Sequence, residues 1–313
     1  MRVVHQFAPP MSAMIASLPG VTSASHIPRE SRWALPVDAD VLMVLGSGDD
    51  SADRAAPRPA GWPGMTRLVQ LASAGVDEYP DWLFEAPLVA TASGTTARPI
   101  AEYVMAAILS HTKRLGEITL KPGDPWPLRE PGTGTPLGTL QGRTLGLLGL
   151  GAIGSQVARF AAAFDMTIIA TRASTAPSPD PNVTLVPLAD LLRRADHLVI
   201  CAPISDATRG LLDATALASM KSGAHIVNIA RGAIIDTAAL LAELDAGRLS
   251  ASLDVTDPEP LPPGHRLIGH PQARVTPHLS WSSPDTPRRV FERLAENIRR
   301  VAAGEELLGV YRR

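Results

Sequence analysis

The sequence predicts an α/β protein with two doubly wound, parallel-sheet domains. Three observations support this class: short apolar runs alternate with amphipathic segments, the chain has 313 residues, and a stretch rich in Pro and Gly at 121–138 divides it. A strand that is repeatedly followed by a helix indicates a parallel sheet with helices on both faces. At about 100–200 residues per domain, the length favours two domains.

The first domain is expected to cover residues 1–112 and to be completed by residues 285–313. Apolar runs predict its strands, and a stretch rich in Pro, Gly and Ala predicts a loop between two of them. Pro99 is expected to begin a helix, because an N–H in the first turn has no partner within the helix. The predicted strands are 1–6, 41–45 and 68–71, the loop is 49–64, and a last helix over 286–303 is expected to pack on this domain.

The second domain is expected over residues 113–284, where strands and helices alternate regularly. Its helices are predicted from apolar residues that recur at helical spacing. The carboxyl ends of parallel strands share one edge of a sheet, and open α/β sheets bind their ligands at that edge. The predicted strands are 144–148, 167–171, 197–201, 225–229, 251–255 and 274–276, and the predicted helices are 153–164, 187–195 and 237–246.

The composition argues against several kinds of partner. The net charge is −2 and the basic residues are scattered, so neither a nucleic acid nor an anionic membrane is expected to bind. No run approaches the roughly 18 apolar residues of a membrane span, and the first residues lack the apolar core of a signal peptide. Cys201 is the one cysteine, so no intrachain disulfide is possible, and a reducing, cytoplasmic location is expected. No Cys/His cluster has the spacing of a metal site, so no metal is expected.

A glycine-rich turn directly follows the first strand of the second domain. Gly149, Gly151 and Gly154 form the pattern G-x-G-x-x-G, with Ala152 and Ile153 opening the next helix. The first glycine permits a tight turn, the second lets a pyrophosphate approach the backbone, and the third lets helix and strand pack closely. The helix N-terminus adds free N–H groups and a partial positive charge. The pattern also occurs in turns that bind no nucleotide, but its place between strand and helix predicts a dinucleotide site.

The end of the next strand bears on which dinucleotide binds. An acidic residue there would bind the ribose 2′-hydroxyl of NAD(H). Thr171 and Arg172 stand there instead, and no carboxylate follows directly. A guanidinium suits the 2′-phosphate of NADP(H), although an arginine after a strand is also an ordinary surface residue. The sequence therefore favours NADP(H) and leaves NAD(H) possible.

Three further strand ends place an arginine, a carboxylate and a histidine at the same rim. Arg231, Glu259 and His278 each have an ordinary interpretation as a loop or surface residue. Together they suit carbonyl reduction, because histidine can supply the proton that the carbonyl oxygen needs as hydride reaches carbon. A neighbouring carboxylate favours the imidazolium form. An arginine can bind a substrate carboxylate through two hydrogen bonds and polarise the carbonyl. These three residues are the predicted catalytic set.

At this point the sequence resembles the D-isomer-specific 2-hydroxyacid dehydrogenase family over nearly its whole length. The resemblance rests on the motifs 149–154, 228–236, 254–260 and 276–278. It implies a Rossmann domain inserted into a smaller flavodoxin-like substrate domain. It also implies that Arg231 binds the 2-oxo acid, that Glu259 tunes His278, and that His278 is the acid/base.

The resemblance implies further contacts to the cofactor. Cys201, Ala202, Pro203 and Thr208 resemble the family's loop beneath the dinucleotide, and Asp254 resembles its nicotinamide-side aspartate. Cys201 by itself is an ordinary small residue at a strand end, and no thiol chemistry is expected of it. The expected cofactor-binding residues are Gly149, Gly151, Ala152, Ile153, Gly154, Thr171, Arg172, Cys201, Ala202, Pro203, Thr208, Ile229, Ala230, Asp254, His278 and Ser280.

The first domain resembles the family as well. Ser73, Ala74 and Gly75 resemble a loop whose backbone N–H groups hold the substrate carboxylate, so they join Arg231 and His278 as expected substrate-binding residues. Residues 97–102 resemble the start of the interdomain helix. The run 73–77, with 92–94 downstream, is most similar to the glyoxylate/hydroxypyruvate reductase branch.

Two departures from the family bear on the size of the acid. Thr91 replaces a common asparagine, and Leu45-Gly46 lacks an arginine that is often present. Trp281 has two interpretations, either a wall of the substrate pocket or a packing residue.

The leading hypothesis is an NADP(H)-preferring 2-oxoacid reductase that acts on a small acid between the two domains. Phosphite or another small anion is an alternative substrate, whereas formate is disfavoured because family formate enzymes carry glutamine at the Glu259 position. A nucleotide-sensing binding protein without turnover is an alternative from another class. The resemblance implies a homodimer formed through the helix near residues 99–111.

Overall fold

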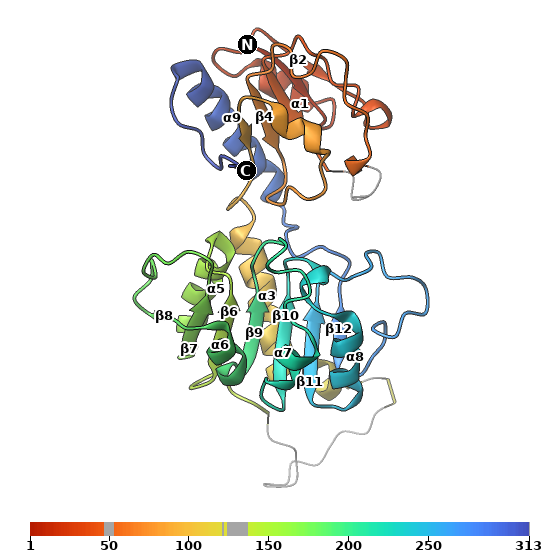
Figure 1. The fold of residues 1–313 in the computed structure, drawn as a ribbon, viewed down its shortest axis with the longest axis vertical. Coiled ribbons are helices and arrows are strands. Elements are labelled where there is room, and N and C mark those ends of the chain that lie inside the picture. Colours follow the sequence, from red (N-terminus) through yellow and green to blue (C-terminus); the bar gives the residue numbers. More distant parts are fainter. Residues whose placement is uncertain (47–52, 121, 124–136, 313) are drawn as a thin grey trace. The chain divides into compact units, whose positions relative to one another are not determined.

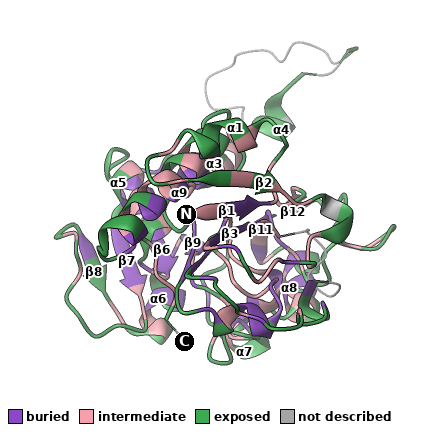
Figure 2. Ribbon diagram, turned by 90° about the horizontal axis from the view of Figure 1, so that it is seen from above, coloured by how far each residue is buried: buried purple, intermediate pink, exposed green. Residues whose placement is uncertain are grey.

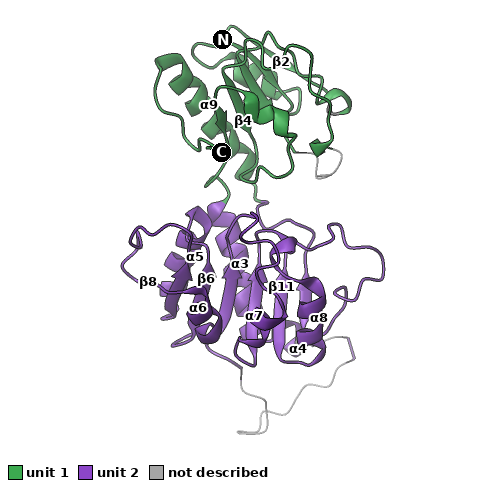
Figure 3. Cartoon of the chain, in the orientation of Figure 1, with its two compact units in different colours: residues 1–96, 283–313 green, residues 97–282 purple. Residues whose placement is uncertain are grey.

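The computed structural model describes residues 1–46, 53–120, 122–123 and 137–312 (Figure 1). The chain divides into two compact units (Figure 3). Unit 1 comprises Met1–Thr96 and Ser283–Arg313, and unit 2 comprises Ala97–Ser282. Each contains a parallel sheet, so the predicted fold class of two parallel-sheet α/β domains is confirmed.

Unit 1 contains a five-stranded sheet in the order β2-β1-β3-β4-β5. All neighbouring strands pair in parallel, and this order is that of a flavodoxin-like sheet. Its strands are β1 (Arg2–His5), β2 (Ser23–His26), β3 (Val41–Val44), β4 (Leu68–Leu71) and β5 (Val89–Ala90), and its helices include α1 (Met11–Ala16), α9 (Thr286–Ala303) and the 3₁₀ turns η1 (Arg29–Ser31) and η2 (Asp81–Glu85).

Helix α9 returns to unit 1, as the sequence predicted. Leu294 and Ile298 are buried in one apolar cluster with Val3, Val41 and Met43 of the sheet. Such burial contributes roughly 1.5–3 kcal/mol for each large apolar side chain. The two ends of the chain thus form one core.

Unit 2 contains a seven-stranded parallel sheet in the order β12-β11-β10-β9-β6-β7-β8. With β6 taken as the first strand, this is the Rossmann order 3-2-1-4-5-6 with one strand added at the edge. The strands are β6 (Thr144–Leu148), β7 (Thr167–Thr171), β8 (Val183–Leu185), β9 (His197–Ile200), β10 (Ala224–Asn228), β11 (Leu249–Leu253) and β12 (Ala273–Val275). The helices are α3 (Ala97–Thr112), α4 (Leu115–Ile118), α5 (Ala152–Ala162), α6 (Leu188–Arg194), α7 (Ala214–Ala218), α8 (Thr237–Asp245) and the 3₁₀ turn η3 (Gly232–Ile234).

Helices cover the unit 2 sheet on two sides. Val104 of α3 and Val157 of α5 share one buried cluster with the strands, whereas Leu191 of α6 and Leu240 of α8 belong to another. Figure 2 shows the buried residues gathered in the strands, with exposed residues on the helices around them. Apolar runs that are buried on both faces are what a parallel sheet requires.

The division between the units differs from the predicted domain boundaries at 112/113 and 284/285. Helix α3 packs against α5 and β10, so its whole length belongs with unit 2. The sequence assigned this helix to the first domain, because its apolar stripe does not reveal which sheet it covers.

Most predicted elements of the regular alternation are present. The strands at 68–71, 144–148 and 167–171 coincide with the prediction, and the others differ by one or two residues at their ends. Residues 49–52 of the predicted loop at 49–64 and most of the crossover at 121–138 lie outside the described residues. Within the described ranges, no helix is both long and apolar enough to cross a bilayer, and no cluster of His, Cys, Asp and Glu suits a metal ion.

Candidate active site

The glycine turn leaves room for a phosphate at one point only. At Gly149, φ is +104°, and an added Cβ would lie 2.7 Å from the Ala202 nitrogen. At Gly154, an added Cβ would lie 2.4 Å from the Gly149 oxygen. At Gly151, an added Cβ would meet nothing within 4 Å. Gly149 and Gly154 therefore serve backbone packing, whereas Gly151 borders open space at the N-terminus of α5, where a dinucleotide pyrophosphate fits.

Arg172 lies directly after β7, at the same edge of the sheet. Its guanidinium donates to the Ala176 oxygen at 2.9 Å and to the Pro177 oxygen at 3.2 Å. These bonds hold the loop that follows β7. They fix the place of one positive charge, which is compatible with a 2′-phosphate and also with a purely structural role.

The loop after β9 lies against the glycine turn. Thr208 donates from Oγ1 to the Pro203 oxygen at 2.8 Å and accepts from the Ser205 N–H at 2.8 Å, which closes this loop. Burial raises the pKa of the Cys201 thiol to about 12. A thiol at that pKa carries no thiolate at neutral pH, in line with the expectation of a packing residue.

Arg231 is placed by the loop that leaves β10. The fully buried Asn228 side chain accepts from the Ala230 N–H at 3.1 Å and donates to the Arg231 oxygen at 2.9 Å. At Gly232, an added Cβ would lie 1.9 Å from the carbonyl carbon of Thr256. The absence of a side chain at Gly232 therefore lets the Arg231 loop approach the segment that carries Glu259.

Glu259 and His278 form a direct pair. His278 Nδ1 lies 2.7 Å from Glu259 Oε1, and the second carboxylate oxygen accepts from the Thr256 N–H at 3.1 Å. Both side chains remain about two-fifths exposed, so the pair lies at a rim rather than in the core. The short contact orients the ring and leaves Nε2 as the nitrogen that can face a substrate.

The charges at this rim act on one another. The hydrogen bond to Glu259 raises the pKa of His278, against the effects of burial and of the Arg231 charge. Burial acts to raise the pKa of Glu259, but the bonds from His278 and the Thr256 N–H outweigh it, so that pKa is lowered. Arg231 affects both groups, which places the predicted catalytic set in one neighbourhood.

The backbone at His278 is held in an uncommon conformation. Its φ is +52°, in the left-handed region that non-glycine residues seldom adopt. The His278 backbone N–H donates to the backbone carbonyl oxygen of Asp254 at 2.9 Å. Trp281 Nε1 donates to the backbone carbonyl oxygen of His278 at 2.8 Å. Trp281 thus has a positioning role at the histidine itself.

The Asp254 carboxylate organises the whole histidine segment. Oδ1 accepts from Thr276 Oγ1 at 2.6 Å and from the Leu279 N–H at 2.9 Å, and Oδ2 accepts from the Ser280 N–H at 2.9 Å. The Thr276 hydroxyl has one proton, which it gives to Asp254, so its 2.7 Å contact with Tyr103 must be accepted from the Tyr103 O–H. A hydrogen-bond chain therefore runs from α3 to the segment that carries His278.

The expected substrate loop in unit 1 is closed by its own hydrogen bonds. Ser73 Oγ donates to the Gly75 oxygen at 2.7 Å and lies 2.8 Å from the Tyr79 hydroxyl. Thr91, one of the departures from the family, contacts the Gly309 oxygen through Oγ1 at 3.3 Å, which gives this residue a structural partner.

The structure thus brings Arg231, Glu259 and His278 together at the carboxyl edge of the unit 2 sheet. The cofactor residues that the sequence predicted follow β6, β7, β9, β10, β11 and β12 at that same edge. Sequence reasoning missed the positioning roles of Asn228, Thr276 and Tyr103. Asn228 and Thr276 stand inside the motifs that carry the resemblance, whereas no sequence signal points to Tyr103.

Comparison with known proteins assigns the family. The profile described as "D-isomer specific 2-hydroxyacid dehydrogenase, NAD binding domain" matches residues 105–280, more than half of the chain. The chain belongs to the D-isomer specific 2-hydroxyacid dehydrogenase family. It is therefore an NAD(P)-dependent oxidoreductase, as the sequence predicted.

Relatives within this dehydrogenase family include named reductases. The chain is 37% identical to a glyoxylate reductase of Aeropyrum pernix over 69% of its length and 67% of the relative's. It is 35% identical to a hydroxypyruvate reductase of Thermotoga maritima over 88% of its length and 89% of the relative's.

A solved structure from the same family has the same fold throughout. The D-isomer specific 2-hydroxyacid dehydrogenase of Xanthobacter autotrophicus Py2, in complex with NADPH and MES, superposes with a TM-score of 0.78 at 26% identity. The match covers 99% of this chain and 98% of that one.

Proposed function

We propose that this dehydrogenase reduces a small 2-oxo acid, such as glyoxylate or hydroxypyruvate, with NADPH as the preferred donor, and oxidises the corresponding D-2-hydroxy acid in reverse. The observation that carries the proposal is the 2.7 Å pair of Glu259 and His278 with the Arg231 charge beside it. The names of the glyoxylate and hydroxypyruvate reductases among the relatives support this choice of acid.

The dinucleotide would be held at the Gly149–Gly154 turn, with its pyrophosphate at Gly151, and would supply the hydride when bound. His278 holds the proton at Nε2 and gives it to the carbonyl oxygen. Glu259 remains a carboxylate, stabilises the imidazolium and fixes the ring through Nδ1. Arg231 binds the substrate carboxylate and polarises the carbonyl.

The test of the activity is turnover with a panel of acids. The protein is mixed with NADPH and glyoxylate, hydroxypyruvate or pyruvate, and oxidation of the cofactor is followed by absorbance. We expect rapid oxidation with the smaller acids, lost at least 10²-fold in His278→Gln and in Arg231→Gln. Tight NADPH binding without turnover on any oxo acid would favour a nucleotide sensor, and turnover with phosphite alone would favour the small-anion alternative.

The preference for NADPH has its own test. Arg172 supplies the positive charge after β7, and no carboxylate stands beside it. We expect a higher kcat/KM with NADPH than with NADH, and a reversed preference in Arg172→Asp. A native enzyme that prefers NADH would show that the Arg172 guanidinium only holds its own loop.

The proposal includes a homodimer formed through α3, in line with the resemblance of this helix to its counterpart in the family. Sedimentation velocity of the full chain gives the mass directly. A monomer at micromolar concentration would contradict this part of the proposal and leave the activity unaffected.

A further inference from the structure

A cavity of about 500 Å³ lies at the amino edge of the unit 2 sheet, opposite the edge that carries His278. Residues at the amino ends of β9, β10, β11 and β12 line it, together with the carboxyl end of α3. Cavities of this volume hold small molecules. None of the predicted catalytic, substrate-binding or cofactor-binding residues lines it, so an occupant would be separate from the substrate and the dinucleotide.

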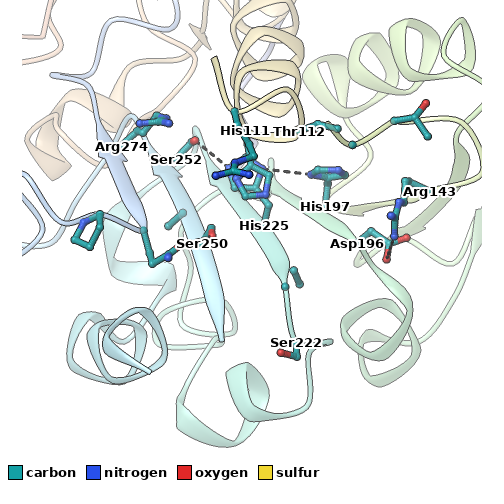
Figure 4. Close-up of a pocket in the computed structure, with 18 residues that line it drawn as sticks. His111, Thr112, Arg143, Asp196, His197, Ser222, His225, Ser250, Ser252 and Arg274 are labelled. Carbon is teal, nitrogen blue, oxygen red and sulfur yellow. Dashed lines mark hydrogen bonds and ion pairs between the residues drawn. The ribbon is translucent and has the colours of Figure 1, made fainter. Parts of the chain in front are cut away.

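Three histidines form the floor of this cavity (Figure 4). The His225 ring stacks on the His111 ring, with the centroids 4.1 Å apart and the planes 10° apart. His225 Nδ1 lies 3.3 Å from His197 Nδ1, and His225 Nε2 lies 3.0 Å from Ser252 Oγ. Burial, with the nearby His111 charge, lowers the pKa of His197 to about 4 and that of His225 well below its usual value. His197 and His225 are therefore neutral at pH 7, and each retains one N–H donor.

Positive charge comes from arginines beside these rings. Arg274 of β12 is exposed, and within the described part of the chain no hydrogen bond or ion pair satisfies its guanidinium. An added Cβ at Gly116 would lie 3.1 Å from Arg274 Nη2, so α4 lies against this guanidinium. Arg114, two residues before Gly116, lines the same cavity. With Arg143, the described lining of the cavity includes three arginines.

An acidic residue, Asp196, lies at the other end of the cavity, and its carboxylate already has hydrogen-bond partners. Among the described lining residues, Asp196 alone carries a carboxyl group. It accepts from the Thr144 N–H at 2.8 Å and from Lys221 Nζ at 2.9 Å, and Arg143 lies 3.9 Å away. Figure 4 shows Asp196 and Arg143 beyond His197, on the side away from Arg274. The described lining therefore carries three arginines and one carboxylate, and Arg274 lies at the end away from that carboxylate.

We propose that the Arg274 end of this cavity is a binding site for a small polyanion with two or more carboxylate or phosphate groups. Arg274 supplies the guanidinium that contacts the ligand, and Arg114 adds positive charge to the lining. The Ser250 hydroxyl donates to Gln272 Oε1 and the Ser252 hydroxyl contacts His225 Nε2, so these groups shape the space beside Arg274. A guanidinium can bind either a carboxylate or a phosphate through two parallel hydrogen bonds. A ligand with more than one negative charge suits the site because three arginines and one carboxylate line the cavity.

The experiment measures binding to the full chain by isothermal titration calorimetry at constant ionic strength. The probes are citrate for the carboxylate arm and inorganic pyrophosphate for the phosphate arm, with acetate as a singly charged comparison. We expect citrate or pyrophosphate to bind at one site per chain, and acetate to bind far more weakly. Arg274→Gln should weaken binding at least tenfold, because a charged pair of hydrogen bonds is lost.

Two matched variants locate the binding. Arg266→Gln removes an exposed arginine that pairs with Asp245 outside the cavity and should leave the affinity unchanged. Arg231→Gln should also leave it unchanged, which excludes binding at the proposed catalytic rim. Circular dichroism confirms that each variant is folded. Unchanged affinity in Arg274→Gln, equal loss in Arg266→Gln, or no binding of either probe at millimolar concentration would overturn the proposal.

Discussion

At the scale of single residues, the Glu259–His278 pair determines how the proposed reaction depends on pH. Glu259 raises the pKa of His278 through the 2.7 Å hydrogen bond, so the imidazolium persists above the usual pH of about 6.5. Reduction needs the protonated ring and oxidation needs the neutral ring. The two directions should therefore have opposite pH profiles with a common midpoint.

The first prediction concerns that midpoint. In the native enzyme, kcat/KM for reduction should be constant at low pH and fall as the pH rises through the raised pKa of His278. In Glu259→Gln the stabilising charge is lost while the Arg231 charge remains, so the fall should move to lower pH, and kcat should drop about 10²-fold or more. Initial rates between pH 5 and 10 give both profiles. A midpoint that Glu259→Gln leaves in place would show that the pair does not control the proton.

At the scale of elements, Tyr103 of helix α3 is expected to affect the position of His278, and so kcat, although the two residues are not in direct contact. The Tyr103 O–H donates to Thr276 Oγ1, and Thr276 donates to Asp254, whose other bonds hold residues 279 and 280. Tyr103→Phe removes one neutral hydrogen bond, a loss of about 0.5–1.5 kcal/mol. We predict a two- to tenfold fall in kcat with little change in the KM for the dinucleotide, measured by steady-state kinetics.

A matched substitution separates this effect from a general loss of hydroxyl groups. Tyr311 of unit 1 packs its ring against Phe84 and takes no part in the Asp254 network, so Tyr311→Phe should leave kcat unchanged. Equal effects of the two substitutions, or none from Tyr103→Phe, would show that the histidine segment does not depend on α3.

The loop that carries Arg231 lies in close contact with the segment that carries Glu259. An added Cβ at Gly232 would lie 1.9 Å from the Thr256 backbone, so Gly232→Ala must push the Arg231 loop and the Glu259 segment apart. Overpacking of this kind costs about 1–3 kcal/mol, and a displacement near 1 Å at a catalytic group can cost 10²-fold in rate. Urea unfolding should show the loss of stability, and turnover the loss of activity. Native stability and native rate in this variant would contradict the close approach.

The strands and helices that could be predicted from the sequence are those that are buried enough to need a recognisable run or stripe of apolar residues. Strands buried on both faces, such as β4 and β6, appear in the sequence as short apolar runs. Strand β2 has the sequence Ser-Ala-Ser-His and pairs only with β1 at the sheet edge, so it carries no apolar signal. Short helices such as α1 and α7 are too brief for a helical period to show.

The proximity of the three predicted catalytic residues could be expected for a topological reason. Strand ends in a parallel sheet share an edge, so Arg231, Glu259 and His278 could be placed together although 47 positions separate the first from the last. Tyr103 could not be placed in this way, because it lies 173 positions before Thr276 on a helix whose packing partner the sequence does not reveal. The assignment of α3 to unit 2 was missed for the same reason.

At the scale of the whole molecule, the glycine turn and the predicted catalytic residues belong to the same unit. Both lie within Ala97–Ser282, so a dinucleotide held at that turn is expected to stabilise unit 2 directly. A ligand present at 100 times its Kd adds about 2.7 kcal/mol to the stability of the state that binds it. For a domain of this size, that corresponds to a rise in Tm of roughly 5–10 °C, because 1 kcal/mol shifts Tm by about 2–4 °C.

Gly151 allows this linkage to be tested without harm to the fold. An added Cβ there meets nothing within 4 Å, and the residue has φ −97°, which any amino acid can adopt. Gly151→Val should therefore keep the native Tm in the absence of ligand, while its branched side chain occupies the space where a pyrophosphate would approach the backbone. We predict that NADPH raises the Tm of the native chain and not that of Gly151→Val, as measured by differential scanning calorimetry. An equal rise in both proteins would place the dinucleotide away from the glycine turn, whereas a lower Tm without ligand would show that Gly151 serves packing in the way that Gly149 and Gly154 do.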